Sequence, residues 1–134
     1  MAVQDCILVV DDESSVRTFL KTVLKKADFK VLEACDGLEA LSVIEQSSGR
    51  IDLLLTDIRM PRLDGVALAE TVAQRYPDIP VLFLSGYPFE VETERQKHPS
   101  RACGFVQKPF LPKALLEAVR KCLDSPEPAI RATA

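Results

Sequence analysis

Two acidic segments follow apolar runs in this chain, and their carboxylates are of the kind that bind cations. Asp11 and Asp12 follow the apolar run of residues 7–10, and Asp57 ends the largely apolar run of residues 51–57. If the two runs lie side by side, their carboxylates repel one another unless a cation lies among them or their protonation changes. Oxygen ligands of this type suit Mg²⁺. The pattern therefore predicts a magnesium site.

Two further strand-like runs lead to polar residues whose side chains can act together with these carboxylates. Ser85 closes the run of residues 81–85, and Lys108 follows residues 103–106. Transfer of a phosphoryl group to a carboxylate depends on positioning and on neutralising charge, and a hydroxyl, an ammonium and a metal supply both. We therefore predict that Asp57 is the nucleophile, and that Ser85 and Lys108 bind phosphoryl oxygens.

The elements that must position these groups alternate between strand and helix. Continuous apolar runs of this length are typical of strands buried on both faces of a parallel sheet, whose ligands bind at the carboxyl ends. Regular alternation predicts a doubly wound, five-stranded parallel α/β sheet with helices on both faces. The predicted strands are residues 7–10, 29–34, 51–56, 81–85 and 103–106, and the predicted helices are residues 16–27, 38–46, 66–76, 90–98 and 112–123.

Length and composition limit the class of protein. The chain has 134 residues and a formal net charge of −3, which predicts one domain over residues 1–124, a disordered tail over 125–134, and no nucleic-acid surface. It has neither a signal peptide nor the roughly 20 apolar residues of a membrane helix, so we expect a cytoplasmic protein without a membrane partner. Four cysteines without a CxxC pair and a single histidine argue against zinc, a disulfide scaffold and Cys/His catalysis.

Five short motifs occur in order between residues 6 and 123. They are Val9-Val10-Asp11-Asp12-Glu13, Thr56-Asp57-Ile58-Arg59-Met60-Pro61, Asp64-Gly65, Leu84-Ser85-Gly86 and Lys108-Pro109-Phe110. Together they resemble the motifs of the receiver domains of two-component response regulators. The resemblance implies a flavodoxin-like (βα)5 fold, like that of chemotaxis regulators. It also implies a candidate cis peptide between Lys108 and Pro109.

The resemblance further implies a function. Asp57 would accept a phosphoryl group from a histidine kinase or a histidine phosphotransfer protein, and a changed surface would then bind an unknown downstream protein. Mg²⁺ would be held by Asp11, Asp12, Asp57 and the backbone carbonyl of Arg59. The run Phe83-Leu84-Ser85-Gly86-Tyr87-Pro88 also resembles receivers fused to hybrid histidine kinases, so a stand-alone regulator and an excised receiver both stay open.

Three side chains are expected to tune this chemistry. Phe105 occupies the switch position of the family, where Ser85 moves toward the phosphoryl group and an aromatic ring turns inward. A Phe there gains packing but no buried hydrogen bond. Arg59 and Tyr87 flank the presumed path of the hydrolytic water. Because these large side chains would crowd that water, we expect slow self-dephosphorylation.

Other interpretations of the same residues exist. Asp11 and Asp12 suit a helix N-terminus, Glu13 suits an exposed first turn, and Lys108 taken alone is an ordinary surface lysine. A magnesium-dependent phosphohydrolase would want an acid where Arg59 stands. A flavodoxin-like cofactor protein would need a phosphate-binding loop after the first strand. A receiver-shaped interaction module that does not use phosphate is the remaining alternative.

Overall fold

The computed structural model describes residues 4–86 and 103–124, and its elements follow the predicted strand and helix order. The predicted helix at residues 90–98 and the predicted tail lie outside the described residues. The strands are β1 (Cys6–Val10), β2 (Lys30–Ala34), β3 (Leu53–Asp57), β4 (Val81–Ser85) and β5 (Gly104–Gln107), and the helices are α1 (Ser14–Lys26), α2 (Gly37–Gln46), α3 (Gly65–Arg75) and α5 (Pro112–Asp124).

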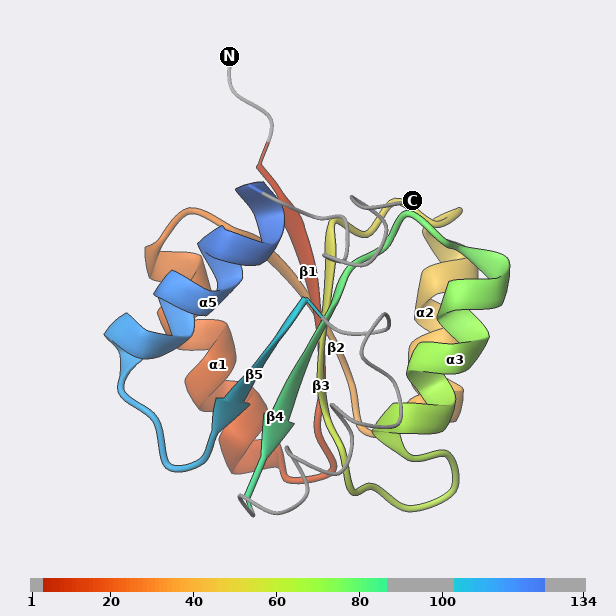
Figure 1. The fold of residues 1–134 in the computed structure, drawn as a ribbon, viewed down its shortest axis with the longest axis horizontal. Coiled ribbons are helices and arrows are strands. Elements are labelled where there is room, and N and C mark those ends of the chain that lie inside the picture. Colours follow the sequence, from red (N-terminus) through yellow and green to blue (C-terminus); the bar gives the residue numbers. More distant parts are fainter. Residues whose placement is uncertain (1–3, 87–102, 125–134) are drawn as a thin grey trace.

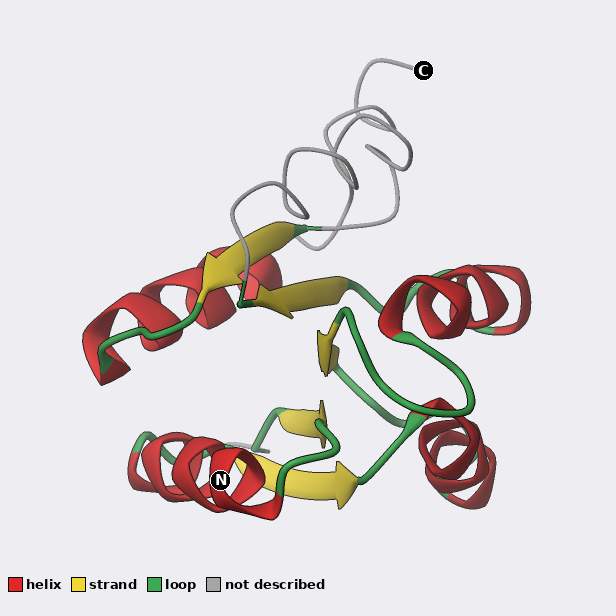
Figure 2. Ribbon diagram, turned by 90° about the horizontal axis from the view of Figure 1, so that it is seen from below, coloured by secondary structure: helices red, strands yellow, loops and turns green. Residues whose placement is uncertain are grey.

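The strands form one parallel sheet in the order β2-β1-β3-β4-β5. Helices α1 and α5 cover one face, and α2 and α3 cover the other (Figure 1). The view in Figure 2, turned by 90°, shows the sheet between these two helical layers. The chain runs outward from β1 in one direction to β2 and in the other to β3, so the topological switch point of the sheet lies between β1 and β3. Ligands of open α/β sheets bind at such a point.

Burial on both faces explains why the strands are apolar along their whole length. In β1, Ile7 and Val9 belong to the cluster that also contains Leu20 of α1 and Leu115 of α5. Leu8 and Val10 belong to the opposite cluster, which includes Ala40 of α2 and Leu68 of α3. Successive side chains of a strand point to opposite faces, and here each face meets a helical layer. Among the described residues, no helix is both long enough and apolar enough to cross a membrane.

The strand register fixes which residues meet at the carboxyl end of the sheet. Val10 pairs with Thr56, so the residues that follow them, Asp11 and Asp57, lie at the same level. Asp57 pairs with Leu84 of β4. The next residue of β4, Ser85, pairs with Gln107 of β5. Lys108 comes directly after that pair. Parallel pairing therefore brings these polar groups to one edge of the sheet, as the sequence predicted.

The cysteines depart from the sequence-based interpretation. A disulfide joins Cys103, directly before β5, to Cys122 of α5, whose Cα atom lies 5.5 Å away. The two cysteines are 19 residues apart and form no CxxC motif, so no local pattern indicated that they pair. The sequence argued against a disulfide scaffold and did not indicate this single cross-link, which forms because α5 packs back onto β5 and brings the two positions together. Cys6 and Cys35 are free.

Candidate functional site

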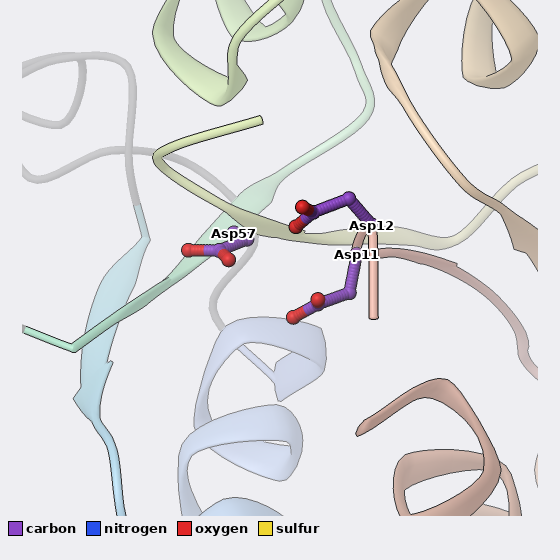
Figure 3. Close-up of side chains that lie close together, drawn as sticks. All are labelled: Asp11, Asp12 and Asp57. Carbon is purple, nitrogen blue, oxygen red and sulfur yellow. The ribbon is translucent and has the colours of Figure 1, made fainter. Parts of the chain in front are cut away.

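Three carboxylates meet where β1 and β3 end. Asp11, Asp12 and Asp57 each place an oxygen atom within 4.8 Å of the other two, and their side chains face a common space (Figure 3). Asp11 is fully buried and Asp57 nearly so, whereas Asp12 is exposed. Two buried carboxylates and one exposed carboxylate thus meet at the switch point between β1 and β3.

Lys108 is the cationic partner of this cluster. Its Nζ atom donates to Asp11 Oδ2 at 3.0 Å and to Asp57 Oδ2 at 3.1 Å. These bonds join segments 97 and 51 residues apart in the sequence, so the lysine is not an ordinary surface residue. Lys108 contacts two of the three carboxylates, and the cluster offers the oxygen ligands that a divalent cation binds.

The charges of the cluster shift the pKa values of two of its members. Burial raises the pKa of the Asp57 carboxyl, with a further rise from the charge of Asp11, while the ammonium of Lys108 acts in the opposite direction. Burial opposes the charge of Lys108, but its hydrogen bond to Asp11 and the charge of Asp57 together raise its pKa. The lysine therefore stays protonated, and Asp57 is less stable as an anion than an exposed aspartate.

Asp11 also contacts the beginning of α1. Its Oδ1 atom accepts a hydrogen bond of 2.9 Å from the backbone N–H of Glu13, which is the N-cap residue of α1 and makes no side-chain cap of its own. Asp11 therefore precedes the helix and is not its N-cap, so the helix N-cap interpretation of Asp11 is wrong, although one of its oxygens orders the residue that enters α1. The other oxygen binds Lys108, so the same carboxylate serves both the helix start and the anionic cluster.

The loop between β3 and α3 carries the backbone of Arg59. Gly65 at its end donates a hydrogen bond of 2.8 Å to the carbonyl of Ile58. Thr56 Oγ1 donates to the carbonyl of Asp57 at 2.9 Å. A Cβ atom on Gly65 would lie 2.0 Å from that same carbonyl oxygen. The loop therefore folds closely over the end of β3, and only glycine fits where it meets Asp57.

Sequence reasoning missed a second set of contacts that holds this loop in place. Arg62, in a left-handed conformation with φ 65°, donates from Nε to Asp36 Oδ2 at 2.7 Å, and its Nη2 contacts the same oxygen. Asp36 is buried and caps α2 by accepting a hydrogen bond from the N–H of Glu39. This bond lowers the pKa of the Asp36 carboxyl most, and the pairing with Arg62 lowers it further, although burial acts to raise it. Gly37 donates to the carbonyl of Leu63 at 3.2 Å. The loop is thus tied to the start of α2 at two points.

The remaining predicted residues lie at the ends of β4 and β5. Ser85 is fully buried, and its carbonyl accepts from the N–H of Lys108 at 2.7 Å. The peptide between Lys108 and Pro109 is cis, as the motif suggested. Phe105 is partly buried and stacks on Phe83 with ring centroids 5.5 Å apart.

The structure does not test the roles predicted for two positions in the dephosphorylation of Asp57. The side chain of Arg59 is exposed in the loop after β3. Tyr87 lies outside the described residues. The roles assigned to both residues in dephosphorylation stay predictions.

Comparison with known proteins gives consistent matches. Residues 7–120 match the family model described as the response regulator receiver domain. The sensor kinase CckA of Brucella abortus (strain 2308) is 35% identical over 118 residues, which cover 88% of this chain and 12% of that protein. The DNA-binding transcriptional regulator NtrC of Escherichia coli (strain K12) is 34% identical over 104 residues, which cover 78% of this chain and 22% of that protein.

Solved structures agree with these sequence matches. The response regulator protein TrrA of Thermotoga maritima, in complex with Mg²⁺ and BeF, superposes with a TM-score of 0.76 at 33% identity and covers 88% of this chain and 98% of that one. The doubly wound fold predicted from the sequence is confirmed. The chain spans less than a quarter of the length of the two sequence relatives named above.

Proposed function

Because the chain belongs to the response regulator receiver domain family, we propose that it accepts a phosphoryl group on Asp57 from a phosphohistidine donor and thereby changes a protein-binding surface. One observation carries the proposal. The ammonium of Lys108 spans Asp11 and Asp57 within a cluster of three carboxylates at the switch point of the sheet. That arrangement supports a nucleophile beside a fixed cation that can bind the arriving phosphoryl group.

In the proposed reaction, Asp57 forms one new bond, and Lys108 and Ser85 bind phosphoryl oxygens. A carboxylate oxygen of Asp57 attacks the phosphorus atom, a new oxygen–phosphorus bond forms, and the nitrogen–phosphorus bond to the donor histidine breaks. Lys108 stays charged throughout, because its pKa is raised, and its Nζ atom lies 3.1 Å from Asp57 Oδ2, from where it can bind a phosphoryl oxygen. Ser85 is assigned to another phosphoryl oxygen. The site thus works by position and charge.

The residues fit a magnesium ion as resident cofactor. Asp11, Asp12, Asp57 and the backbone carbonyl of Arg59 are the proposed ligands, all of them the hard oxygen donors that Mg²⁺ prefers. When bound, the ion neutralises charge that develops on the phosphoryl group. The excess of carboxylates over the single ammonium of Lys108 supports this assignment.

We expect Mg²⁺ binding to depend on Asp12 and to be independent of Glu13. Both residues are acidic, exposed and adjacent in the chain, but only Asp12 belongs to the cluster. A Mg²⁺ concentration of one hundred times Kd should stabilise the wild-type fold by about 2.7 kcal/mol. Asp12→Asn should weaken Mg²⁺ binding at least about tenfold, since it removes an anionic ligand, and Glu13→Gln should bind as the wild type does. Thermal unfolding over a Mg²⁺ titration measures both, and equal losses in the two variants would refute the ligand assignment.

The switch and the partners follow from the family and stay proposals. Movement of Ser85 toward the phosphoryl group and reorientation of Phe105 would alter the surface near β5. The donors would be a histidine kinase or a histidine phosphotransfer protein in the cytoplasm. CckA and NtrC are much longer than this chain. Their activities and targets are therefore not assigned to it.

Phosphate release separates this function from the two alternatives. With Mg²⁺ and an excess of acetyl phosphate, we expect slow but measurable release, below about one phosphate per chain per minute, on the proposal that Arg59 and Tyr87 crowd the attacking water. This is far below typical enzyme turnover. Arg59→Asn combined with Tyr87→Glu should accelerate release. A phosphohydrolase would release phosphate at 1 s⁻¹ or faster, on the order of ordinary enzymes, and an interaction module that does not use phosphate would release none. Either outcome would contradict the proposal.

A further inference from the structure

The disulfide links the residue before the edge strand β5 to helix α5, which packs on that strand. β5 is the last strand in the sheet order, and Cys103 precedes its first residue. Cys122 lies 19 residues later, near the end of α5. The closed segment therefore contains all of β5, the Lys108–Pro109 turn and most of α5. It includes both Phe105 and Lys108, which the proposed function uses.

The two cysteines differ in exposure. Cys122 is 2% exposed and packs in the apolar cluster with Leu115 and Val119. Cys103 is only partly buried and packs against the edge of the same cluster. Because Cys103 is the more exposed residue, it is the one that a small thiol from solvent reaches, and the sulfur of Cys122 is then the leaving group.

The same site also accommodates the two thiols. The Sγ atom of Cys103 lies 3.2 Å from the carbonyl oxygen of Val81, which gives the reduced thiol an acceptor without any movement of the chain. The backbone N–H of Cys103 donates to that same carbonyl at 2.8 Å in either state. A reduced Cys122 behaves as a small apolar side chain, which suits its buried position. Neither oxidation state leaves a buried polar group unpaired.

We propose that Cys103 and Cys122 form a reversible thiol–disulfide site that reacts with low-molecular-weight thiols of the glutathione class and sets how firmly α5 is held on β5. A thiolate attacks Cys103 Sγ, the bond between the two cysteine sulfurs breaks, and Cys122 leaves as a thiolate and takes a proton. A second thiolate attacks the mixed disulfide at the sulfur of the small thiol and releases Cys103. Two small thiols become one disulfide, and the protein gains two electrons and two protons.

The consequence of reduction follows from the loop that the bond closes. A cross-link over 19 residues restricts the unfolded chain, so opening it should lower the melting temperature of this domain by about 10 °C. The loss of protection should be greatest near the bond. Amides of β5 and of the last turns of α5 should gain more in deuterium exchange rate than those of α2 and α3, which gain only through global unfolding. Disulfides of proteins in glutathione-reduced compartments are usually transient, catalytic or redox-sensing, which suits a reversible role.

The test uses the whole chain without Mg²⁺ or a phosphoryl donor, so that its failure leaves the proposed function untouched. Wild-type protein is equilibrated with glutathione disulfide or with reduced glutathione. Its melting temperature is measured, and so is its mass after alkylation in denaturant, which exposes the buried Cys6 and Cys122. We expect two alkylated cysteines in the oxidised form, Cys6 and Cys35, and all four in the reduced form. The melting temperature should fall on reduction and recover on reoxidation.

Two variants control for a general effect of thiol reagents. Cys35→Ser should respond as the wild type does, because Cys35 is free. Cys103→Ser combined with Cys122→Ala should melt at the lower temperature in both buffers. A wild type that shows four reactive thiols after glutathione disulfide would overturn the site. A bond that survives millimolar reduced glutathione would overturn its reversibility.

Discussion

Replacing Lys108 with Met should slow phosphoryl transfer from acetyl phosphate by about 10² to 10³, the cost of removing one preorganised donor from a reacting oxygen. The same substitution should strengthen Mg²⁺ binding at least about tenfold, since the ammonium no longer competes for Asp11 and Asp57, which lie 3.0 Å and 3.1 Å from it. A slower reaction at tighter metal binding cannot result from unfolding or from loss of the ion. Rates are measured by intact mass at saturating Mg²⁺.

The matched control is Lys113→Met. Lys113 lies in the first turn of α5 and is exposed, so its loss should leave both the transfer rate and the Mg²⁺ affinity as in the wild type. If Lys108→Met accepted phosphoryl groups at the rate of this control, the ammonium would have no part in the transfer.

Gly65→Ala should be the most destabilising of the substitutions considered, by about 3 kcal/mol or more. The added Cβ atom would lie 2.0 Å from the carbonyl oxygen of Asp57 and 3.0 Å from the Cα atom of Ile58. Both are backbone atoms, so no side-chain rotation relieves the contact. The loop after β3 must move, and it carries the proposed carbonyl ligand of Arg59 with it. We therefore expect weaker Mg²⁺ binding as well as a lower melting temperature.

Gly86→Ala tests whether this effect is specific. Gly86 is also a glycine at the carboxyl end of a strand, but no heavy atom lies within 4 Å of a Cβ atom built on it. Its free energy of unfolding in urea should stay within about 0.5 kcal/mol of the wild type. Equal losses in the two variants would mean that loss of glycine flexibility, and not contact with Asp57, determines the result.

The strands and the cluster were predictable because each rests on a local pattern. Burial of β1 on both faces makes it apolar throughout, and its end is marked by Asp11 and Asp12. Once β1 and β3 are neighbours in the sheet, parallel register places Asp57 beside them, since strands of one parallel sheet end at one edge. Helix α1 has the clear period of an amphipathic helix, and its buried residues Leu20 and Leu24 are four positions apart on one face.

Contacts between distant positions were not predictable from local pattern. Arg62 reaches Asp36 across 26 residues from a left-handed backbone that no glycine signalled. Cys103 and Cys122 meet because of the angle at which α5 returns onto the sheet edge. Such pairs depend on how loops and helices settle on the sheet, which the spacing of residues does not encode. The hydrogen bond from the N–H of Gly37 to the carbonyl of Leu63 is a distant contact of the same kind.

The decisive measurement is the intact mass of the protein after incubation with Mg²⁺ and acetyl phosphate, beside Asp57→Asn and a sample with EDTA. We expect a single phosphoryl adduct on the wild type and none in either of the other two samples. Asp57→Asn should remain folded, because an amide replaces a carboxylate whose charge is disfavoured by burial. An adduct that persists in Asp57→Asn would refute the assigned acceptor. A folded wild type that stays unlabelled, while another receiver is labelled in the same buffer, would contradict phosphoryl acceptance itself.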